Sequence, residues 1–349
     1  MKKAVLLNDT SVSRHLGCQL VVSQIKTLAA QNNIEIINTC PVGKHWRSIE
    51  SDLLAADFCI VNGEGTIHHQ AKAGLVLAEA ASFCKKHGKP SFLINSICHD
   101  NGPEINRHLS DFSAIYVRES LSRNYLSSVG IESTVVPDLT LYQNIESDSI
   151  QPARAGFFFT DSVYKDVSRD IFSLAFSSGY ADRFLPIQPV VRTIEKNMGA
   201  GKFFRSVKKK LKFEAGKFFI LKSANLPGLK DRYSLAFKRA LFQDVDLEKF
   251  LRELVACQLF LTGRYHGVCL ALLTRTPFVA VSSNTFKIEG MLRDIGLQGR
   301  VFEKVTALEN FLANPQPFTN EEISRIDKYL LHAKDMTDKM FTRIGQAVR

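Results

Sequence analysis

The stretch that decides the fold is CQLFLTGRYHGVCLALLTRTPFVAVSS, residues Cys257–Ser283. It begins with the apolar run Cys257–Leu261, which is typical of a buried strand, and Thr262-Gly263 ends that run. The small and apolar residues of Tyr265–Leu273 predict a buried helix, and Phe278–Val281 predicts a second buried strand. Strand, helix and strand in this order form the unit of a parallel sheet that helices cover on both faces.

Two polar residues, Arg264 and His266, lie where the predicted strand becomes the predicted helix. Backbone N–H groups at a helix start are unpaired, and the helix dipole favours an anion there. An arginine adds a planar fork for phosphate or carboxylate, and a histidine can carry a proton near neutral pH. Open α/β sheets bind ligands beyond the carboxyl ends of their strands, which favours function over the alternative of a surface arginine beside a core-edge histidine.

The composition is that of an ordinary soluble protein, with 45% hydrophobic and 23% charged residues in a chain of 349. The apolar runs are too short for a membrane span, and MKKAVLLNDT reads as a first strand rather than a signal segment. Seven scattered cysteines, mostly inside apolar runs, favour reduced thiols in a cytoplasmic protein.

The net charge of +10 is concentrated in one segment, because residues 202–222 hold eight Lys or Arg and one Glu. A uniformly basic surface would indicate nucleic acid, whereas one basic segment with Phe between its charges favours an anionic membrane surface. Phe204, Val207, Leu211 and Phe218 recur at near-helical spacing, as in a helix that lies on a membrane. We expect a peripheral location at the inner membrane face and no nucleic-acid partner; a solvated basic loop is the alternative.

Strands and helices alternate along the chain in two series. In the first, the predicted strands are 4–7, 34–37, 57–61, 91–95, 112–117 and 133–136. The predicted helices are 14–30, 46–54 and 71–87, with another in RESLSRNYLSSVGI that Gly130 ends. In the second, the predicted strands before the central stretch are 155–159 and 183–191, the latter interrupted by prolines. The further helices are 167–176, 247–255, 285–295, 305–312 and 320–349.

The polar tract QNIESDSIQP, residues 143–152, predicts the boundary between two domains. Residues 1–145 then form an N-terminal α/β domain, and residues 153–349 a C-terminal one with a basic insertion at about 199–229. The predicted fold class is α/β, with two Rossmann-like domains and a cleft between them, in a GT-B-like architecture. A ligand in that cleft would contact NGEGTIHH from one domain and GRYHG from the other.

The loop NGEGTIHH, Asn62–His69, is the second feature with chemical content. Gly63 and Gly65 let the backbone turn tightly and approach a ligand closely. We expect Glu64 to be an exposed carboxylate that orients a sugar hydroxyl or acts as a base. The alternative for the loop is an ordinary strand–helix turn, with His68 and His69 as surface residues.

Cysteine and histidine also occur close together at Cys84 and His87 and at Cys98 and His99. Structural zinc needs four ligands with paired spacing, and no second pair accompanies these, so we expect no metal. Lys287 lies early in the helix after the last strand of the central stretch, where it could reach a phosphate or remain an exposed lysine.

Three motifs together resemble the polysaccharide pyruvyl transferase family, in the same order along most of the chain. GRYHG followed by P-x-x-x-x-S-x-N-x-x-K resembles its C-terminal R-x-H signature with a downstream Lys. VRESLSRNYLSSVGIESTVVPDLTL, residues Val117–Leu141, looks like its VRE/D…S…L…G…PD block. NGEGTIHH looks like its glycine-rich loop, with Asn62 and Glu64 in place of two glycines.

The resemblance implies phosphoenolpyruvate (PEP) as donor substrate, with no cofactor, and a glycan or lipid-linked sugar as acceptor. It implies that two hydroxyls of one sugar receive the pyruvyl group as a ketal. The N-terminal domain would then bind the acceptor, and the C-terminal domain would bind PEP. Arg264 then binds PEP, His266 is the acid that protonates it, and Glu64 or Asp138 is the acceptor's base. The other implied substrate-binding residues are Gly263, Tyr265, Lys287, Arg118, Asn62, Gly63 and Gly65.

The sequence departs from the family pattern at two places. The family often has an arginine at the end of the first strand of the C-terminal half, where FFFTDS places Thr160 and Asp161, so Arg192 is the expected substitute. The first loop, NDTSVSRHLGC, lacks the family's N-x-G-D, and His15 and Gly17 are expected to serve the acceptor side instead.

Two other functions remain open on the residues alone. Arg264, Lys287 and a helix N-terminus would suit a nucleotide diphosphate equally well, as in a nucleotide-sugar-dependent GT-B glycosyltransferase. A non-catalytic protein that binds a membrane surface or nucleic acid would rest on the charge alone.

Overall fold

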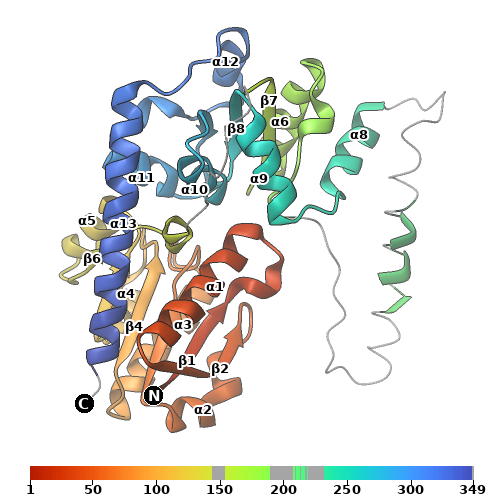
Figure 1. Ribbon diagram of the computed structural model, residues 1–349. Coiled ribbons are helices and arrows are strands. Elements are labelled where there is room, and N and C mark those ends of the chain that lie inside the picture. Colours follow the sequence, from red (N-terminus) through yellow and green to blue (C-terminus); the bar gives the residue numbers. More distant parts are fainter. Residues whose placement is uncertain are drawn as a thin grey trace.

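The computed structural model of the chain, drawn in Figure 1, describes residues 1–143, 154–188 and 232–347, together with residues 207–208, 210–212, 214–216 and 218. Most of the predicted boundary tract, most of the predicted basic insertion and Arg192 lie outside these residues.

In the described N-terminal half, a parallel sheet has the strand order β2-β1-β3-β4-β5-β6. Its strands are β1 (Lys2–Asp9), β2 (Ile34–Pro41), β3 (Phe58–Asn62), β4 (Ser91–Ser96), β5 (Ala114–Val117) and β6 (Thr134–Val135). Its helices are α1 (Leu16–Gln31), α2 (Glu50–Ala55), α3 (Lys72–Lys86), α4 (Pro103–Leu109) and α5 (Ser120–Ser128), with 3₁₀ turns η1 (Thr10–Ser13), η2 (Trp46–Ile49) and η3 (Leu139–Tyr142).

Both faces of this sheet are buried, because successive side chains of a strand point to opposite faces. On β1, Val5 and Leu7 belong to the apolar cluster that includes α3, α4 and α5. Ala4 and Leu6 belong to the cluster on the other face, which includes α1. The nearly continuous apolar runs of these strands follow from burial on both faces.

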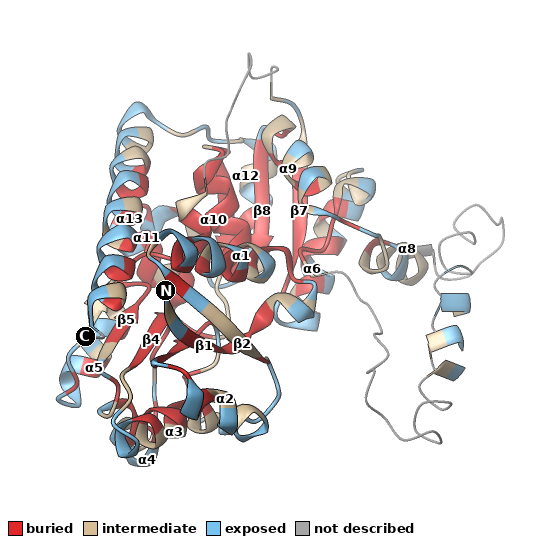
Figure 2. Ribbon diagram, turned by 60° about the horizontal axis from the view of Figure 1, so that its bottom comes forward, coloured by how far each residue is buried: buried red, intermediate tan, exposed pale blue. Residues whose placement is uncertain are grey.

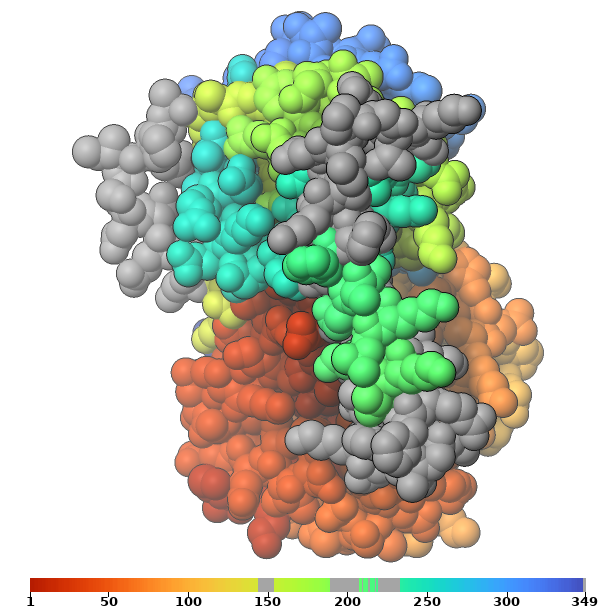
Figure 3. All heavy atoms as spheres, turned by 90° about the vertical axis from the view of Figure 1, so that its right-hand side faces the viewer, coloured from red at the N-terminus to blue at the C-terminus, as the bar shows by residue number. Residues whose placement is uncertain are grey.

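The described C-terminal half has a second parallel sheet, of order β10-β9-β8-β7. Its strands are β7 (Phe157–Ser162), β8 (Leu259–Gly263), β9 (Phe278–Val281) and β10 (Val301–Phe302). The helices are α6 (Lys165–Ser177), α8 (Arg232–Leu241), α9 (Leu247–Ala256), α10 (Tyr265–Leu273), α11 (Lys287–Ile295), α12 (Glu309–Ala313) and α13 (Asn320–Gln346), with 3₁₀ turns η4 (Ala181–Arg183), η6 (Gln298–Arg300) and η7 (Val305–Leu308). Figure 3 shows the red and orange N-terminal half and the yellow-green to blue C-terminal half as two lobes.

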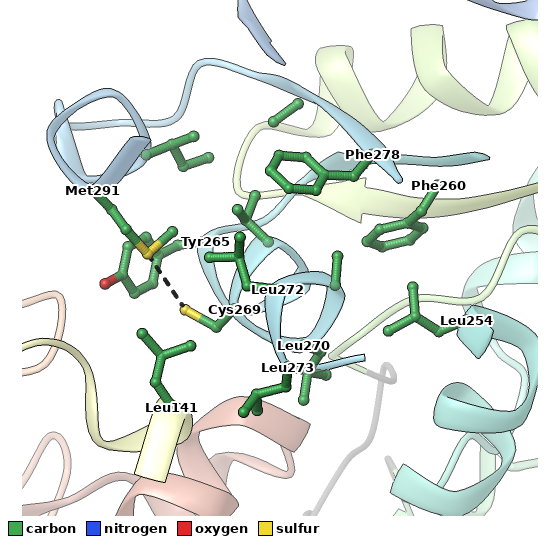
Figure 4. Packing of buried hydrophobic residues seen from close by; sticks show 14 of the residues in the cluster. Leu141, Leu254, Phe260, Tyr265, Cys269, Leu270, Leu272, Leu273, Phe278 and Met291 are labelled. Carbon is green, nitrogen blue, oxygen red and sulfur yellow. Dashed lines mark hydrogen bonds between the residues drawn. The ribbon is translucent and has the colours of Figure 1, made fainter. Parts of the chain in front are cut away.

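Helix α10 lies in the interior, and every one of its residues is buried. Figure 2 shows this helix and β8 in red, whereas α13 alternates between buried and exposed residues along its length. In Figure 4, side chains of α10 such as Leu270 and Leu272 share a cluster with Phe260 of β8 and Phe278 of β9, and Leu141 of the N-terminal half lies near Cys269, away from these two rings. The predicted strand–helix–strand unit is therefore the core of the C-terminal half and part of its contact with the N-terminal half.

Helix α13 joins the two halves, as Figure 1 shows by its course alongside both. Its first turns bury Ile326 and Tyr329 in the cluster around α10, and its last turns bury Phe341 and Ile344 against α1 and β1. Lys2 donates a hydrogen bond to the Gly345 carbonyl at 2.6 Å, so the end of α13 lies beside the first strand. Its N-terminus has a capping box between Thr319 and Glu322.

The structure corrects some of the elements predicted from sequence. The strand predicted at 183–191 is wrong for the residues described: 181–183 form η4, and only an isolated bridge joins Phe184 to Phe159. Pro186 interrupts this segment, and a proline cannot donate to a sheet. Helix α4 was not predicted, although Pro103 at its first position is a helix-start signal. Thr262 and Gly263 do not end the central strand, because β8 continues through them and Gly263 pairs with Ser162.

No helix among the described residues is long and apolar enough to span a bilayer. All seven cysteines lie in the described part of the chain and are free thiols, and six of them are buried.

Phe341→Ala should lower the free energy of unfolding by about 3–5 kcal/mol, because it leaves a cavity between α13 and the N-terminal sheet. Leu331, 70% exposed on the same helix, provides the matched control, and Leu331→Ala should change the value by less than about 0.5 kcal/mol. Urea unfolding followed by circular dichroism measures both. Equal, small effects would show that α13 does not stabilise the N-terminal half.

Candidate functional site

Side chains from both halves meet where the carboxyl ends of their strands face each other. His15 is the N-cap of α1, Glu64 follows β3, and Asp138 is the N-cap of η3. From the C-terminal half, Arg264 is the N-cap of α10 and His266 lies in its first turn. Parallel strands carry these residues to one edge, as expected for a ligand site in α/β sheets.

His266 and Glu64 form the central contact, with Nε2 of His266 3.0 Å from Oε1 of Glu64. Both residues are buried. The prediction that Glu64 is exposed is therefore wrong, because His266 of the C-terminal half packs against its carboxylate. The N–H direction is poorly aligned with the carboxylate, so the contact is not a hydrogen bond, and among the described residues neither atom has a hydrogen-bond partner. His266 and Glu64 are therefore close enough for an ion pair, and each of the two atoms can still form a hydrogen bond with a ligand.

The other oxygen of Glu64 is held by its own loop and by η1. Thr10 donates a hydrogen bond to Oε2 of Glu64 at 2.7 Å, and the amide of Asn62 donates at 3.4 Å. Burial raises the pKa of Glu64, but the adjacent His266 outweighs this effect and holds the pKa well below its usual range. Glu64 is therefore a carboxylate at neutral pH, oriented by Asn62 and Thr10.

Asp138 and Arg118 form a second buried pair beside this contact. Nη1 of Arg118 donates to Oδ2 of Asp138 at 2.9 Å, and both side chains are almost completely buried. The same carboxylate oxygen lies 3.9 Å from Nε2 of His266, and the other accepts the backbone N–H of Thr140 at 2.8 Å. The Arg118 guanidinium lies 4.5 Å from the centre of the Tyr265 ring. Asp138 is thus engaged by Arg118 and by its own turn.

Arg264 is oriented by Asp161 at the end of β7. Nε of Arg264 donates to Oδ2 of Asp161 at 3.0 Å, and Nη2 donates to the same oxygen. The other oxygen of Asp161 accepts the N–H of Ile187 at 3.0 Å. The position where the family often has an arginine therefore carries the residue that directs Arg264.

Lys287 is the first residue of α11 and is buried, not exposed. It donates to the side-chain oxygen of Asn284 at 2.6 Å. Burial, with the positive charges of Arg118 and Arg264, lowers its pKa to about 7. Three basic side chains thus lie in one site, where the carboxylates of Asp138, Asp161 and Glu64 accompany them.

His15 and α1 close the site from the N-terminal half. The His15 ring meets the His266 ring edge-on at 5.1 Å, and its Nδ1 accepts the N–H of Cys18. Burial, followed by the charges of His266 and Arg264, lowers the pKa of His15, so its ring is neutral. Only glycine fits at position 17, because a Cβ there would overlap the His266 ring.

The predicted glycines also have steric roles. A Cβ at Gly63 would overlap the Ser96 side chain, and one at Gly263 would lie 2.5 Å from Cβ of Ser162. Gly65 has a φ of +61°, which favours glycine.

A metal has one candidate ligand set in the part of the chain described. The N and S atoms that His15, Cys18 and His266 could offer lie within 4.8 Å of one another. Burial, and then the charge of Glu64, raises the pKa of Cys18, which makes it a thiol. Arg118, Arg264 and Lys287 add positive charge that opposes a bound cation, and the expected absence of a metal stays a prediction.

The structure gathers every predicted site residue that it describes, and Arg192 lies outside the described residues. Thr10 and Cys18 were not predicted, and Asp161 was noted only as a departure from the family. Asp161 carried a usable signal, since it is a charged residue at the carboxyl end of an apolar strand. Thr10 and Cys18 carried no such sequence signal, because their contacts depend on how the first loop folds.

Comparison with known proteins gives a family and a fold. The family model of polysaccharide pyruvyl transferases matches residues 15–285. No curated protein matches the chain. UDP-GlcNAc 2-epimerase of Methanocaldococcus jannaschii, solved with UDP-GlcNAc and UDP, is 17% identical over 95% of this chain and 100% of its own, with a TM-score of 0.52. The α,α-trehalose 6-phosphate synthase of Burkholderia multivorans is 11% identical over 99% and 96%, with a TM-score of 0.46.

The fold class predicted from sequence is confirmed: two Rossmann-like domains with parallel sheets, arranged as in GT-B-type enzymes.

Asp138→Asn should lower the free energy of unfolding by about 3–5 kcal/mol, because it leaves Arg118 as an uncompensated buried charge. Glu321→Gln removes the partner of Arg325 on the exposed face of α13 and should cost less than about 1 kcal/mol. Urea unfolding at pH 7 compares the two. A cost for Asp138→Asn no larger than that of the control would mean that the buried pair is not needed for stability.

Proposed function

Because the chain belongs to the polysaccharide pyruvyl transferase family, we propose that it transfers the pyruvyl group of PEP onto a sugar of a bacterial surface glycan or its lipid-linked precursor. The product is a ketal and the released group is phosphate. The observation that carries this proposal is the buried His266–Glu64 contact with Arg118, Arg264 and Lys287 around it. This arrangement pairs a proton donor and a base inside a site suited to a polyanion.

The donor's charges match the cations of the site. PEP carries a carboxylate and a phosphate, each of which needs a cationic or N–H-rich partner. Arg264 stands at the N-terminus of α10, where unpaired backbone N–H groups would also favour a bound anion. Lys287 stands at the N-terminus of α11. In our proposal Arg264 binds the donor, and Lys287 with the start of α10 stabilises the leaving phosphate.

The first chemical step forms two bonds and consumes the C2–C3 double bond of PEP. A hydroxyl oxygen of the acceptor attacks C2 while His266 gives its proton to C3, which becomes a methyl group. Glu64 receives the proton of the attacking hydroxyl. Because Glu64 and His266 are in contact at 3.0 Å, that proton can pass back to His266.

The second step exchanges phosphate for the second hydroxyl. The C2–O bond to phosphate breaks, the second hydroxyl oxygen bonds to C2, and its proton leaves with phosphate. The two hydroxyl protons therefore end on C3 and on phosphate. We assign the base to Glu64 rather than Asp138, because both oxygens of Asp138 already accept hydrogen bonds, whereas Oε1 of Glu64 accepts none from the described residues.

We also propose where in the cell the protein meets its acceptor. Within the described parts of residues 202–222, Leu211 and Phe218 are exposed, at 65% and 58%. Exposed apolar residues among lysines support a peripheral contact with an anionic membrane surface, where lipid-linked glycans are assembled. We therefore propose a cytoplasmic enzyme at the inner membrane face.

The purified protein should release phosphate from PEP in the presence of an extract of undecaprenyl-linked or polymeric bacterial glycans. His266→Ala should reduce the rate at least 10²-fold, the order expected for loss of a positioned acid. His332→Ala, an exposed histidine on α13, is the control and should not change it. Tight binding of a nucleotide diphosphate with no binding of PEP would instead indicate a nucleotide-sugar glycosyltransferase.

Binding of PEP should be accompanied by uptake of a proton at pH 8. The pKa of Lys287, about 7 in the free protein, leaves this amine mostly neutral at pH 8, and a bound phosphate dianion raises that pKa and recharges it. Calorimetry in two buffers of different ionisation enthalpy measures an uptake approaching one proton. Lys287→Met should abolish the uptake, whereas Lys328→Met on the exposed face of α13 should not. Proton release by the wild type would contradict the assignment of Lys287.

A further inference from the structure

Three histidines, His68, His69 and His99, form a cluster beside the site. His68 and His69 end the loop that carries Glu64, and His99 follows β4. A parallel bridge joins His68 to His99, and the N–H of His69 donates to the carbonyl of His99 at 2.9 Å. The centre of the His69 ring lies 5.0 Å from the ring centre of His68 and 5.0 Å from that of His99. The cluster is half-buried, with His69 exposed.

The cluster borders both halves and the catalytic contact. The His99 ring lies 4.3 Å from the ring of Phe286, which belongs to the C-terminal half and precedes Lys287. The charge of Lys287 acts both on His68 and on His15, so this lysine adjoins the cluster and the site alike. The histidine cluster, with its exposed member His69, therefore connects the end of the loop that carries Glu64 with the residue before Lys287.

Hydrogen-bond partners assign the tautomers of the first two rings. The carbonyl oxygen of Gly65 can only accept, so Nε2 of His68, 3.1 Å away, must donate to it. Burial is the main cause that lowers the pKa of His68 to about 4, so this ring is neutral and its Nδ1 carries no proton. Nδ1 of His69 lies 2.8 Å from that atom and must donate to it. Neutral His69 is thus left with an unprotonated Nε2.

Backbone strain accompanies this arrangement. His69, Gln70 and Asp100 have φ values of +52°, +52° and +47°, a region that residues with a side chain rarely adopt. The three lie in the two adjacent loops of the cluster. Strain of this kind persists where the surroundings hold it, and it gathers at ligand sites.

We propose that the histidine cluster is a subsite for the acceptor sugar, in which Nε2 of His69 accepts a hydrogen bond from a hydroxyl of a pyranose ring. His68 is a positioning residue that sets the tautomer of His69. An unprotonated nitrogen cannot bond to the acceptor-only oxygens of PEP, but a sugar hydroxyl can donate to it. The subsite rests on the proposed pyruvyl transfer and adds the residue that orients the acceptor.

The first test measures the tautomer directly. Long-range ¹H–¹⁵N spectra of the full chain, labelled with ¹⁵N-histidine and assigned with His69→Ala, should show His69 protonated on Nδ1 at pH 8. In His68→Ala this preference should be lost, while His332→Ala should leave it unchanged. A wild-type His69 protonated on Nε2 overturns the proposal.

The second test separates acceptor from donor. Phosphate release from PEP is measured with a panel of methyl pyranosides of glucose, galactose and mannose as acceptors. His69→Ala should raise the KM for the acceptor about tenfold or more and leave the KM for PEP unchanged, and His69→Gln, which can present an oxygen near Nε2, should recover part of the loss. His332→Ala should change neither value.

The outcomes distinguish the subsite from the function. If the wild type fails to bind PEP in a thermal-shift assay, the proposed function fails. If the wild type turns over and His69→Ala keeps its acceptor KM, the subsite fails while the function stands. If no methyl pyranoside is turned over, the ¹⁵N signal of His69 Nε2 is followed as each is added: a shift supports the subsite, and none overturns it.

Discussion

His266 from the C-terminal half meets Glu64 from the N-terminal half at 3.0 Å, inside the protein rather than at its surface. A charge that is removed from water is costly unless partners compensate it, so this contact imposes conditions on everything around it. Thr10 and Asn62 satisfy the far oxygen of Glu64. Gly17 leaves room for the ring of His266, and the fully buried helix α10 supplies its rigid base.

The charges near this contact balance in pairs. Arg118 is matched by Asp138, and Arg264 by Asp161, so each cation is held in a defined direction before any ligand binds. Among the described residues, Lys287 has no such carboxylate within hydrogen-bonding distance and donates to an amide oxygen, which leaves its charge sensitive to an incoming anion. Arg118 and Arg264 are thus preorganised, while Lys287 can gain or lose a proton. Such a set of cations suits a ligand whose charge can change.

The contact also requires that the two halves keep their relative position. Helix α13 packs on α10 with its first turns and on the N-terminal sheet with its last, and Asp294 of α11 accepts hydrogen bonds from Ser120 of α5. The N–H of Leu16 at the start of α1 donates to the carbonyl of Ile187, whose own N–H bonds to Asp161. The residue that orients Arg264 is thus linked to the helix that carries Gly17.

The sequence by itself determined the alternation of strands and helices, the doubly covered parallel sheets and the positions of Arg264 and His266 at the start of a buried helix. These features depend on apolar periodicity and turn residues, which are local properties of the chain. It also singled out Glu64, Asp138 and Lys287, which the structure brings close together, although with the wrong exposure for Glu64. Only the tertiary structure decided that Asp161 directs Arg264, that Arg118 is committed to Asp138, and that His68, His69 and His99 adjoin Phe286. These are contacts between segments far apart in sequence, and burial and charge pairing depend on which segments meet, which no local pattern records.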